Sequence, residues 1–230
     1  MARRLNPPLK NIFRKTNTKY NSEDNAVLDI QKTTCEFIVE GQTEVSYFNS
    51  LKSNNNLLFT IDKIINLKGC EGGGLFETCA KEIYKRLKNP RPNTIICVFD
   101  GDVCCGNNNK SNYNKFLSIL SDFKNEIKMK EILICESVPS IEFWFLVHYD
   151  NNISRFMYTN DAIHELKKHI PNYSKSNSFL DKLDWKSLNA NIASAIKLQS
   201  NVPEESKLSH TNNINISYSN IYKIYQTIPN

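Results

Sequence analysis

The sequence FIVEGQTE at residues 37–44 decides the fold, because an apolar run ends there in a carboxylate and a helical pattern follows. The sequence IICVFDGD at residues 95–102 has the same arrangement, with acidic residues at its end. Apolar runs of this kind are typical of strands buried in a parallel sheet. If the two strands lie side by side, Glu40, Asp100 and Asp102 meet at one sheet edge, where open α/β sheets bind ligands. Three carboxylates repel one another unless a cation lies between them, and all-oxygen ligand sets suit Mg²⁺ or Mn²⁺.

The apolar periodicity predicts an α/β fold with a mostly parallel, four-stranded sheet flanked by helices over residues 33–150. Strands are expected at 34–39, 57–67, 94–99 and 131–135, and helices at 42–52, 75–87 and 112–128. Residues 100–112 are expected to form a polar loop. Helical patterns at 159–170, 185–199 and 217–227 predict a helical C-terminal extension, residues 151–230, packed on the sheet domain.

The composition is that of an ordinary globular protein, with 40% hydrophobic and 23% charged residues among 230 and a formal charge of +5. That charge permits a nucleic-acid partner without requiring one. Residues 1–32 are polar and basic, and are either a solvated arm or an arm that contacts phosphates. The seven cysteines show no zinc-binding spacing, which indicates a reducing, cytoplasmic location. No apolar run reaches the roughly 18 residues of a membrane span, so no membrane association is expected.

Glu142 is the next candidate, because it lies within the apolar sequence IEFWFLVH at residues 141–148. Burying an unpaired carboxylate is costly, so Glu142 pairs with a cation, accepts hydrogen bonds, joins the metal site or caps the helix that Pro139 leads. Ser137 ends the preceding strand and is expected nearby. Glu44 either stabilises a helix N-terminus or holds a metal-bound water.

Two further residues have a functional and a plain interpretation each. His148 is six residues from Glu142, a spacing that does not share a helix face, so it is either a core histidine or a supporting metal residue or proton carrier. Lys175 is either a surface lysine or a phosphate contact. The glycine run at 72–74 lacks the ATP-loop pattern GxxxxGK[ST], which favours a flexible connection over a phosphate cradle.

These residues, in this order, resemble the Toprim fold, in which a strand-end glutamate precedes a strand-end DxD pair on a parallel sheet. From about residue 33 onward the chain is similar to the RloB family in particular. The motifs that carry the resemblance are VEGQTE at 39–44, VFDGD at 98–102, SVPSIEFW at 137–144 with His148, NYSK at 172–175 and SNIY at 219–222. Gly101 departs from it, where a larger, often basic residue is expected, and so does Ile141, where an aromatic residue is usual.

The resemblance implies a Mg²⁺- or Mn²⁺-dependent nuclease that acts on DNA or RNA, including tRNA, as the effector of a bacterial anti-phage, abortive-infection system. It also implies an ABC- or OLD-type ATPase partner. The alternative is a Toprim module without turnover that regulates or binds such a partner. On the nuclease hypothesis, the metal-binding and catalytic residues are Glu40, Asp100, Asp102 and Glu142, and the supporting residues or phosphate contacts are Glu44, Ser137, His148 and Lys175.

Overall fold

The computed structural model describes residues 32–52, 57–68, 74–89, 92–105, 110–126, 131–150, 156, 158–203 and 217–227. The span Lys32–Asn230 forms one compact unit. The predicted basic arm lies outside the described residues except for Lys32, and so do Gly72 and Gly73 of the glycine run.

The described strands form a five-stranded sheet in the order β2-β1-β3-β4-β5. β1 (Thr33–Val39) pairs in parallel with both β2 (Phe59–Asn66) and β3 (Thr94–Asp100), and β3 pairs in parallel with β4 (Glu131–Val138). β5 (Tyr218–Ser219) lies antiparallel to the end of β4. The predicted α/β fold with a mostly parallel sheet is confirmed, and the predicted number of strands was one too few.

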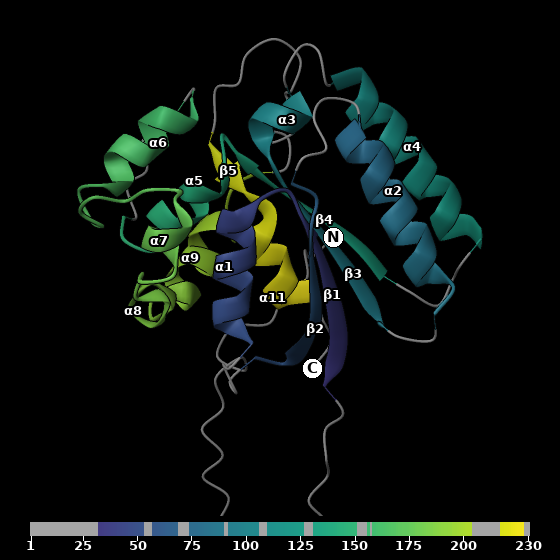
Figure 1. Cartoon of the computed structure of the whole chain (residues 1–230), viewed down its shortest axis with the longest axis horizontal. Coiled ribbons are helices and arrows are strands. Elements are labelled where there is room, and N and C mark those ends of the chain that lie inside the picture. The colour runs from purple at the N-terminus through teal and green to yellow at the C-terminus, as the bar shows by residue number, and fades with distance from the viewer. Residues whose placement is uncertain are drawn as a thin grey trace, which may run out of the picture. The chain divides into compact units, whose positions relative to one another are not determined.

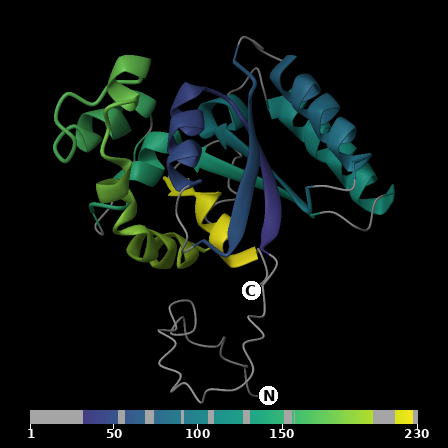
Figure 2. The same ribbon diagram turned by 60° about the horizontal axis from the view of Figure 1, so that its bottom comes forward.

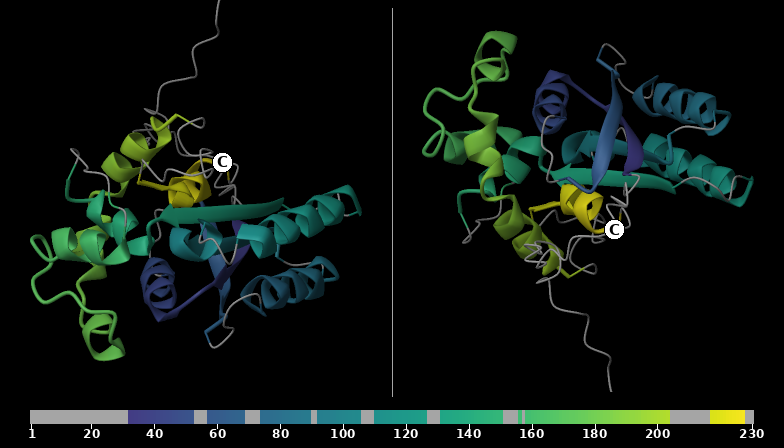
Figure 3. Two further views of the ribbon diagram at one scale, coloured as in Figure 1. Left: turned by 90° about the horizontal axis from the view of Figure 1, so that it is seen from above. Right: turned by 90° about the horizontal axis from the view of Figure 1, so that it is seen from below.

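Helices cover both faces of this sheet (Figures 1 and 3). α1 (Gln42–Leu51) packs on one face, and α2 (Gly74–Leu87) and α4 (Lys110–Glu126) pack on the other. Alternation along β1 makes this arrangement possible, since Phe37 belongs to the hydrophobic cluster of α1 and Ile38 to that of α2 and α4. Both faces of the strand are buried, which explains its continuous apolar run.

Short helices from the second half of the chain pack on the same face as α1 (Figure 2), and Tyr225 Oη of α11 lies 3.4 Å from Tyr47 Oη of α1. One hydrophobic cluster joins them, and within it Trp144 Nε1 donates to Tyr47 Oη at 2.8 Å. Residues of the second half of the chain therefore share one hydrophobic core with α1. Among the described residues, the helices outside the three main ones are α3 (Gly101–Cys105), α5 (Ile141–Leu146), α6 (Thr159–Leu166), α7 (Asn177–Leu180), α8 (Trp185–Asn189), α9 (Ile192–Ser200), the 3₁₀ helix η2 (Asn220–Lys223) and α11 (Ile224–Thr227).

Three predicted elements differ from those observed. The helix expected at 185–199 is two helices, α8 and α9, and the side chain of Asp184 caps the first by accepting from Ser187 N–H at 3.0 Å. The helix expected at 217–227 begins instead with β5, which β4 holds by pairing. The loop expected at 100–112 contains α3 and the start of α4. Each error concerns an element of a few residues, too short to show a period of its own.

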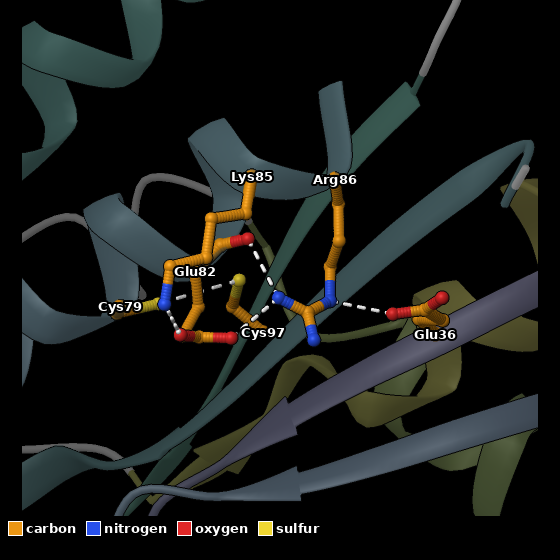
Figure 4. A network of polar contacts seen from close by, with 6 residues as sticks. All are labelled: Glu36, Cys79, Glu82, Lys85, Arg86 and Cys97. Atoms are coloured by element: carbon orange, nitrogen blue, oxygen red, sulfur yellow. Dashed lines mark hydrogen bonds and ion pairs between the residues drawn. The ribbon is translucent and has the colours of Figure 1, made fainter. Parts of the chain in front are cut away.

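A buried ion-pair network fastens α2 to β1 (Figure 4). Arg86 Nε donates to Glu36 Oε2, and Arg86 Nη1 donates to Glu82 Oε2 at 2.6 Å. Arg86 and Glu36 are only 7% and 9% exposed. Lys85 adds a second cation on Glu82, at 2.6 Å, so both carboxylates of this network have cationic partners.

The five cysteines with described side chains are all buried. Two of them lie in contact between α2 and β3, where Cys79 Sγ is 3.7 Å from Cys97 Sγ (Figure 4). They act there as small core residues. Among the described helices, none has both the length and the apolar character that a membrane span needs.

Candidate functional site

The strand order brings the first two candidate residues together. The connection from β1 leads to one edge of the sheet and the connection from β3 leads to the other, so the order reverses between these two strands. Val39 pairs with Val98, and the chain therefore places Glu40 beside the end of β3. Asp100 N–H donates to Glu40 Oε2 at 3.3 Å. Two carboxylates that lie 60 positions apart in the sequence are thus neighbours at the carboxyl edge of the sheet.

The turn between β4 and α5 holds the Asp100–Asp102 segment in place. Asp100 Oδ1 accepts from the Ile141 N–H at the start of α5, at 2.8 Å. In the other direction, the Pro139 carbonyl accepts from Gly101 N–H at 3.0 Å and from Asp102 N–H at 3.3 Å. Hydrogen bonds therefore join the ends of β3 and β4, and they fix the backbone positions of Asp100 and Asp102.

Close packing explains the glycine at position 101, one of the two departures from the family pattern. A Cβ added to Gly101 would lie 2.5 Å from Val138 Cγ2 and 2.9 Å from Val138 Cα, which is too close for any side chain. Glycine lets the DxD segment approach β4 directly. Ile141 contributes its backbone N–H to Asp100, and a residue with any side chain other than proline supplies that group.

Glu142 is fully buried, and three side chains satisfy it. Ser140 Oγ donates to Oε2 at 2.6 Å, and Tyr173 Oη donates to Oε1 at 2.9 Å. Lys175 Nζ lies 3.1 Å from the same Oε1. Of the alternatives raised by the sequence, the structure therefore shows a carboxylate that both pairs with a cation and accepts hydrogen bonds.

Glu44 lies in the first turn of α1 and is 4% exposed. Burial raises the pKa of Glu44 to about 7, the backbone N–H groups of Glu44 and Gly41 counteract this, and the negative charge of Glu142 adds to it. Glu44 can therefore stabilise the N-terminus of α1, and its negative charge interacts with that of Glu142.

We call Glu40, Glu44, Asp100, Asp102 and Glu142 the carboxylate cluster. Burial chiefly raises the pKa of Glu40 to about 7, and the charges of Glu44 and Asp102 raise it further. Burial also raises the pKa of Asp100 well above its usual value, with the charges of Glu44 and Glu142 as the next causes. The pKa of the exposed Asp102 is raised as well, by partial desolvation and by the charge of Glu142.

Lys175 is the cation that the described residues place within this cluster. Burial would lower the pKa of Lys175, but the negative charges of Glu142 and Asp100 outweigh that effect and raise it. Lys175 therefore stays protonated, and its side chain remains 43% exposed. One ammonium does not balance the cluster, and this excess of negative oxygen ligands suits a hard divalent cation.

The side chains do not form a ready ligand sphere. Among the described residues, no three carboxylate, histidine or thiol groups are arranged so that they could hold a metal ion. Their oxygens bond to protein donors instead, as Asp100 does to Ile141 and Glu142 does to Lys175. The chemistry of the donor set fits a divalent cation, and binding one requires these side chains to exchange partners.

Two of the candidate residues lie outside the cluster's interactions. Ser137 Oγ is buried and lies 2.7 Å from Ser219 Oγ, which joins β4 to β5. His148 Nδ1 lies 2.7 Å from the Trp144 carbonyl oxygen, and its ring packs edge-on against the indole. Burial lowers the pKa of His148 to about 4, so the ring is neutral at pH 7. The structure favours the core interpretation of this histidine.

Tyr173 is a site residue that the sequence reasoning missed. It is 2% exposed, and its side chain donates a hydrogen bond to Glu142. Lys175, two positions later in the sequence, pairs with the same carboxylate. Asn172, with φ of 62°, turns the chain just before this segment. The signal that could have found Tyr173 is the spacing of the two residues, since alternate side chains of an extended segment point the same way.

The comparisons with known proteins identify a family. A family model described as RloB-like protein matches residues 37–228, which includes the whole carboxylate cluster and Lys175. No curated protein and no solved structure matches the chain.

Proposed function

This chain belongs to the RloB-like protein family, and we propose that it is a Toprim-type nuclease that cleaves nucleic-acid phosphodiester bonds with Mg²⁺ or Mn²⁺. The observation that carries the proposal is the carboxylate cluster, with its raised pKa values, at the edge where the strand order reverses. Groups held in such a destabilising environment are typical of functional sites.

Glu40, Asp100, Asp102 and Glu142 are the residues that would hold metal. A bound pair of divalent ions supplies stabilisation of the attacking and leaving oxygens in an in-line displacement. Tyr173 and Ser140 keep Glu142 oriented by their hydrogen bonds.

Lys175 and Glu44 have supporting roles in this proposal. Lys175 Nζ lies 3.1 Å from Glu142 Oε1 and its side chain is 43% exposed, so its ammonium would be available to a substrate phosphate at this site. Glu44, with a pKa of about 7, is suited to accept a proton from water at neutral pH.

The biological setting that we propose rests on the resemblance to RloB proteins. The nuclease would act in the cytoplasm on DNA or RNA, tRNA included, as the effector of an anti-phage, abortive-infection system. An ABC- or OLD-type ATPase would be its partner.

Cleavage assays with the purified chain test the activity. We expect tRNA, single-stranded DNA or duplex DNA to be cleaved in Mn²⁺ or Mg²⁺ and left intact in a chelator. Asp100→Asn should lower the rate by about 100-fold or more, because even groups that only support a metal ligand typically account for 10–100-fold. The amide oxygen of Asn still accepts from Ile141, so the fold should persist.

Asp161→Asn is the matched control, because Asp161 is an exposed carboxylate in the first turn of α6. It makes the same chemical change away from the cluster and should leave cleavage unchanged. Full activity of Asp100→Asn in the same assay would refute the metal role.

The second candidate is a Toprim module without turnover that binds or regulates an ATPase. The observation that favours it is the Lys175–Glu142 ion pair, which offsets part of the cluster's charge without any ion. It predicts no cleavage even when an ABC- or OLD-type ATPase is added. Metal-dependent cleavage by the chain, with or without that ATPase, would eliminate it.

A further inference from the structure

One short segment divides the carboxylate cluster from a groove on the surface. Tyr173 and Lys175 reach Glu142, at 2.9 Å and 3.1 Å. The residues between and after them line the groove, which has a volume of about 500 Å³. The residues that line it are Ser174, Ser176, Ser178, Phe179, Lys182, Leu183 and Asp184.

We propose that this groove binds the sugar-phosphate backbone of a single-stranded nucleic acid, next to the bond that the carboxylate cluster cleaves. This inference rests on the proposed nuclease function, because it extends the same site. It assigns to the substrate strand a second contact area that touches no member of the cluster.

The polar side of the groove consists of hydroxyl groups and one lysine. Ser174 Oγ accepts from Ser176 N–H at 3.2 Å, and Ser176 Oγ lies 3.3 Å from Ser178 Oγ. Ser174 and one hydroxyl of the Ser176–Ser178 pair keep a proton that these bonds do not use, so they can donate to phosphate oxygens. Lys182 is exposed and adds a positive charge. Serine and lysine side chains are common partners of nucleic-acid phosphates.

The one carboxylate of the groove already has a structural task. Asp184 caps α8, where its Oδ1 accepts from Ser187 N–H at 3.0 Å. The partial positive charge of the helix N-terminus offsets part of its negative charge. Asp184 therefore opposes a phosphate less than a free carboxylate would.

The apolar side of the groove favours a nucleic-acid strand over free phosphate. Phe179 and Leu183 are partly buried there. The Phe179 ring packs edge-on against Tyr173, with centroids 5.7 Å apart, and so has a fixed position beside the residue that holds Glu142. Sugars and unstacked bases can pack on an aromatic ring, whereas the bases of a duplex are not available to it.

Electrostatics gives the reason why such a contact is needed. The carboxylate cluster repels a polyanion, and Lys175 is engaged with Glu142. The hydroxyl groups and Lys182 of the groove provide the polyanion with favourable contacts, which the carboxylate cluster does not. Substrate affinity should therefore depend on the groove even when no metal is bound.

The test measures binding apart from cleavage. Fluorescence anisotropy of a labelled single-stranded oligonucleotide is recorded in the Asp100→Asn background with chelator present. Lys182→Ala should weaken binding about 5-fold at about 50 mM salt and about 2-fold at about 200 mM, because one lost phosphate contact lowers the salt slope by about 0.7 for a single strand. The double variant Ser176→Ala/Ser178→Ala should weaken binding about 3-fold and leave the slope unchanged, because it removes neutral hydrogen bonds.

Lys168→Ala is the matched control, since it removes the same charge from an exposed lysine of the C-terminal region that pairs with Glu165 at 2.7 Å. Its binding should equal that of the background protein. If Lys182→Ala and Lys168→Ala weaken binding equally, the groove proposal is wrong. Equal competition by inorganic phosphate and by unlabelled strand, at equal phosphate concentration, would show that free phosphate is the ligand and would also overturn it.

The outcomes separate this proposal from the nuclease proposal. If Lys182→Ala weakens binding and the chain without substitutions cleaves no nucleic acid in the assays above, the groove proposal is supported and the nuclease proposal is refuted. Cleavage that requires Asp100, together with binding that ignores Lys182 and the serines, would support the nuclease and refute the groove.

Discussion

Two charged clusters share strand β1 and differ in how their charges are balanced. Glu36 lies within the strand and pairs with Arg86, which also holds Glu82 (Figure 4). Glu40 follows the same strand and accepts a backbone N–H from Asp100, among other carboxylates. Glu36 thus has an ionic partner, whereas four positions later Glu40 has no salt bridge to any residue that the structure describes.

The pKa values move in opposite directions in the two clusters. The pKa of Glu82 lies below its usual value, first because Lys85 donates a hydrogen bond to it and then because of Arg86. The pKa values of Glu40 and Glu44 rise to about 7, chiefly because of burial. The first cluster thus supports the fold. The second cluster opposes folding. A protein retains such a cluster where a ligand supplies the missing charge.

The largest effect on stability is expected from replacing Arg86 in the cluster around Glu36. Its guanidinium is the only buried one among the described residues. Arg86→Met should lower the free energy of unfolding by about 3–5 kcal/mol, because it leaves the buried Glu36 without its cation. Urea denaturation measures the change.

The double variant Arg86→Met/Glu36→Gln is the control for this explanation. It removes the charge of Glu36 together with that of Arg86, and Glu82 keeps Lys85. It should recover a clear part of the lost stability, and a double variant as unstable as Arg86→Met would contradict the charge argument.

The next effect concerns divalent ions and pH in the unbalanced cluster. Glu40 and Glu44 have pKa values of about 7 in the folded chain against 4.5 for an ordinary glutamate, so the folded state holds protons that the unfolded state releases. Without metal, the free energy of unfolding should therefore fall as pH rises from about 4.5 through about 7. Mn²⁺ at about 100 times its Kd should restore about 2.7 kcal/mol above this range and far less below it, because protonated carboxylates bind cations poorly.

Thermal melts with and without Mn²⁺ at both pH values make this measurement. The Asp100→Asn variant should lose most of the Mn²⁺ effect, while Asp161→Asn should keep it. Equal stabilisation by Mn²⁺ in acid and in base would mean that the ion binds elsewhere.

The smallest expected effect is a gain in stability, opposite in sign to the loss expected for Arg86→Met. Glu44→Gln should stabilise the metal-free chain by about 1 kcal/mol above pH 7, because a neutral amide does not repel Glu142 and is cheaper to bury. The gain should vanish below pH 4.5, where the carboxyl is already protonated. Chemical denaturation at the two pH values measures it, with Glu36→Gln as the contrasting variant that should destabilise. Destabilisation by Glu44→Gln at high pH would show that capping of α1 outweighs repulsion.

The sequence by itself determined the α/β fold, the long strands and helices and the meeting of Glu40 with Asp100. These follow from periodicity between near neighbours and from the rule that parallel strands end at one edge, both of which a linear sequence displays. It also indicated that Glu142 would be buried and need partners, because the residues around it are apolar.

Only the tertiary structure decided which partners the charged side chains have. Lys175 pairs with Glu142, and Arg86 pairs with Glu36 from 50 positions away, because separate helices and loops pack against the same strands. The same packing placed His148 in the core and Gly101 against Val138. Such contacts depend on how elements meet in space, and no local pattern of residues encodes that.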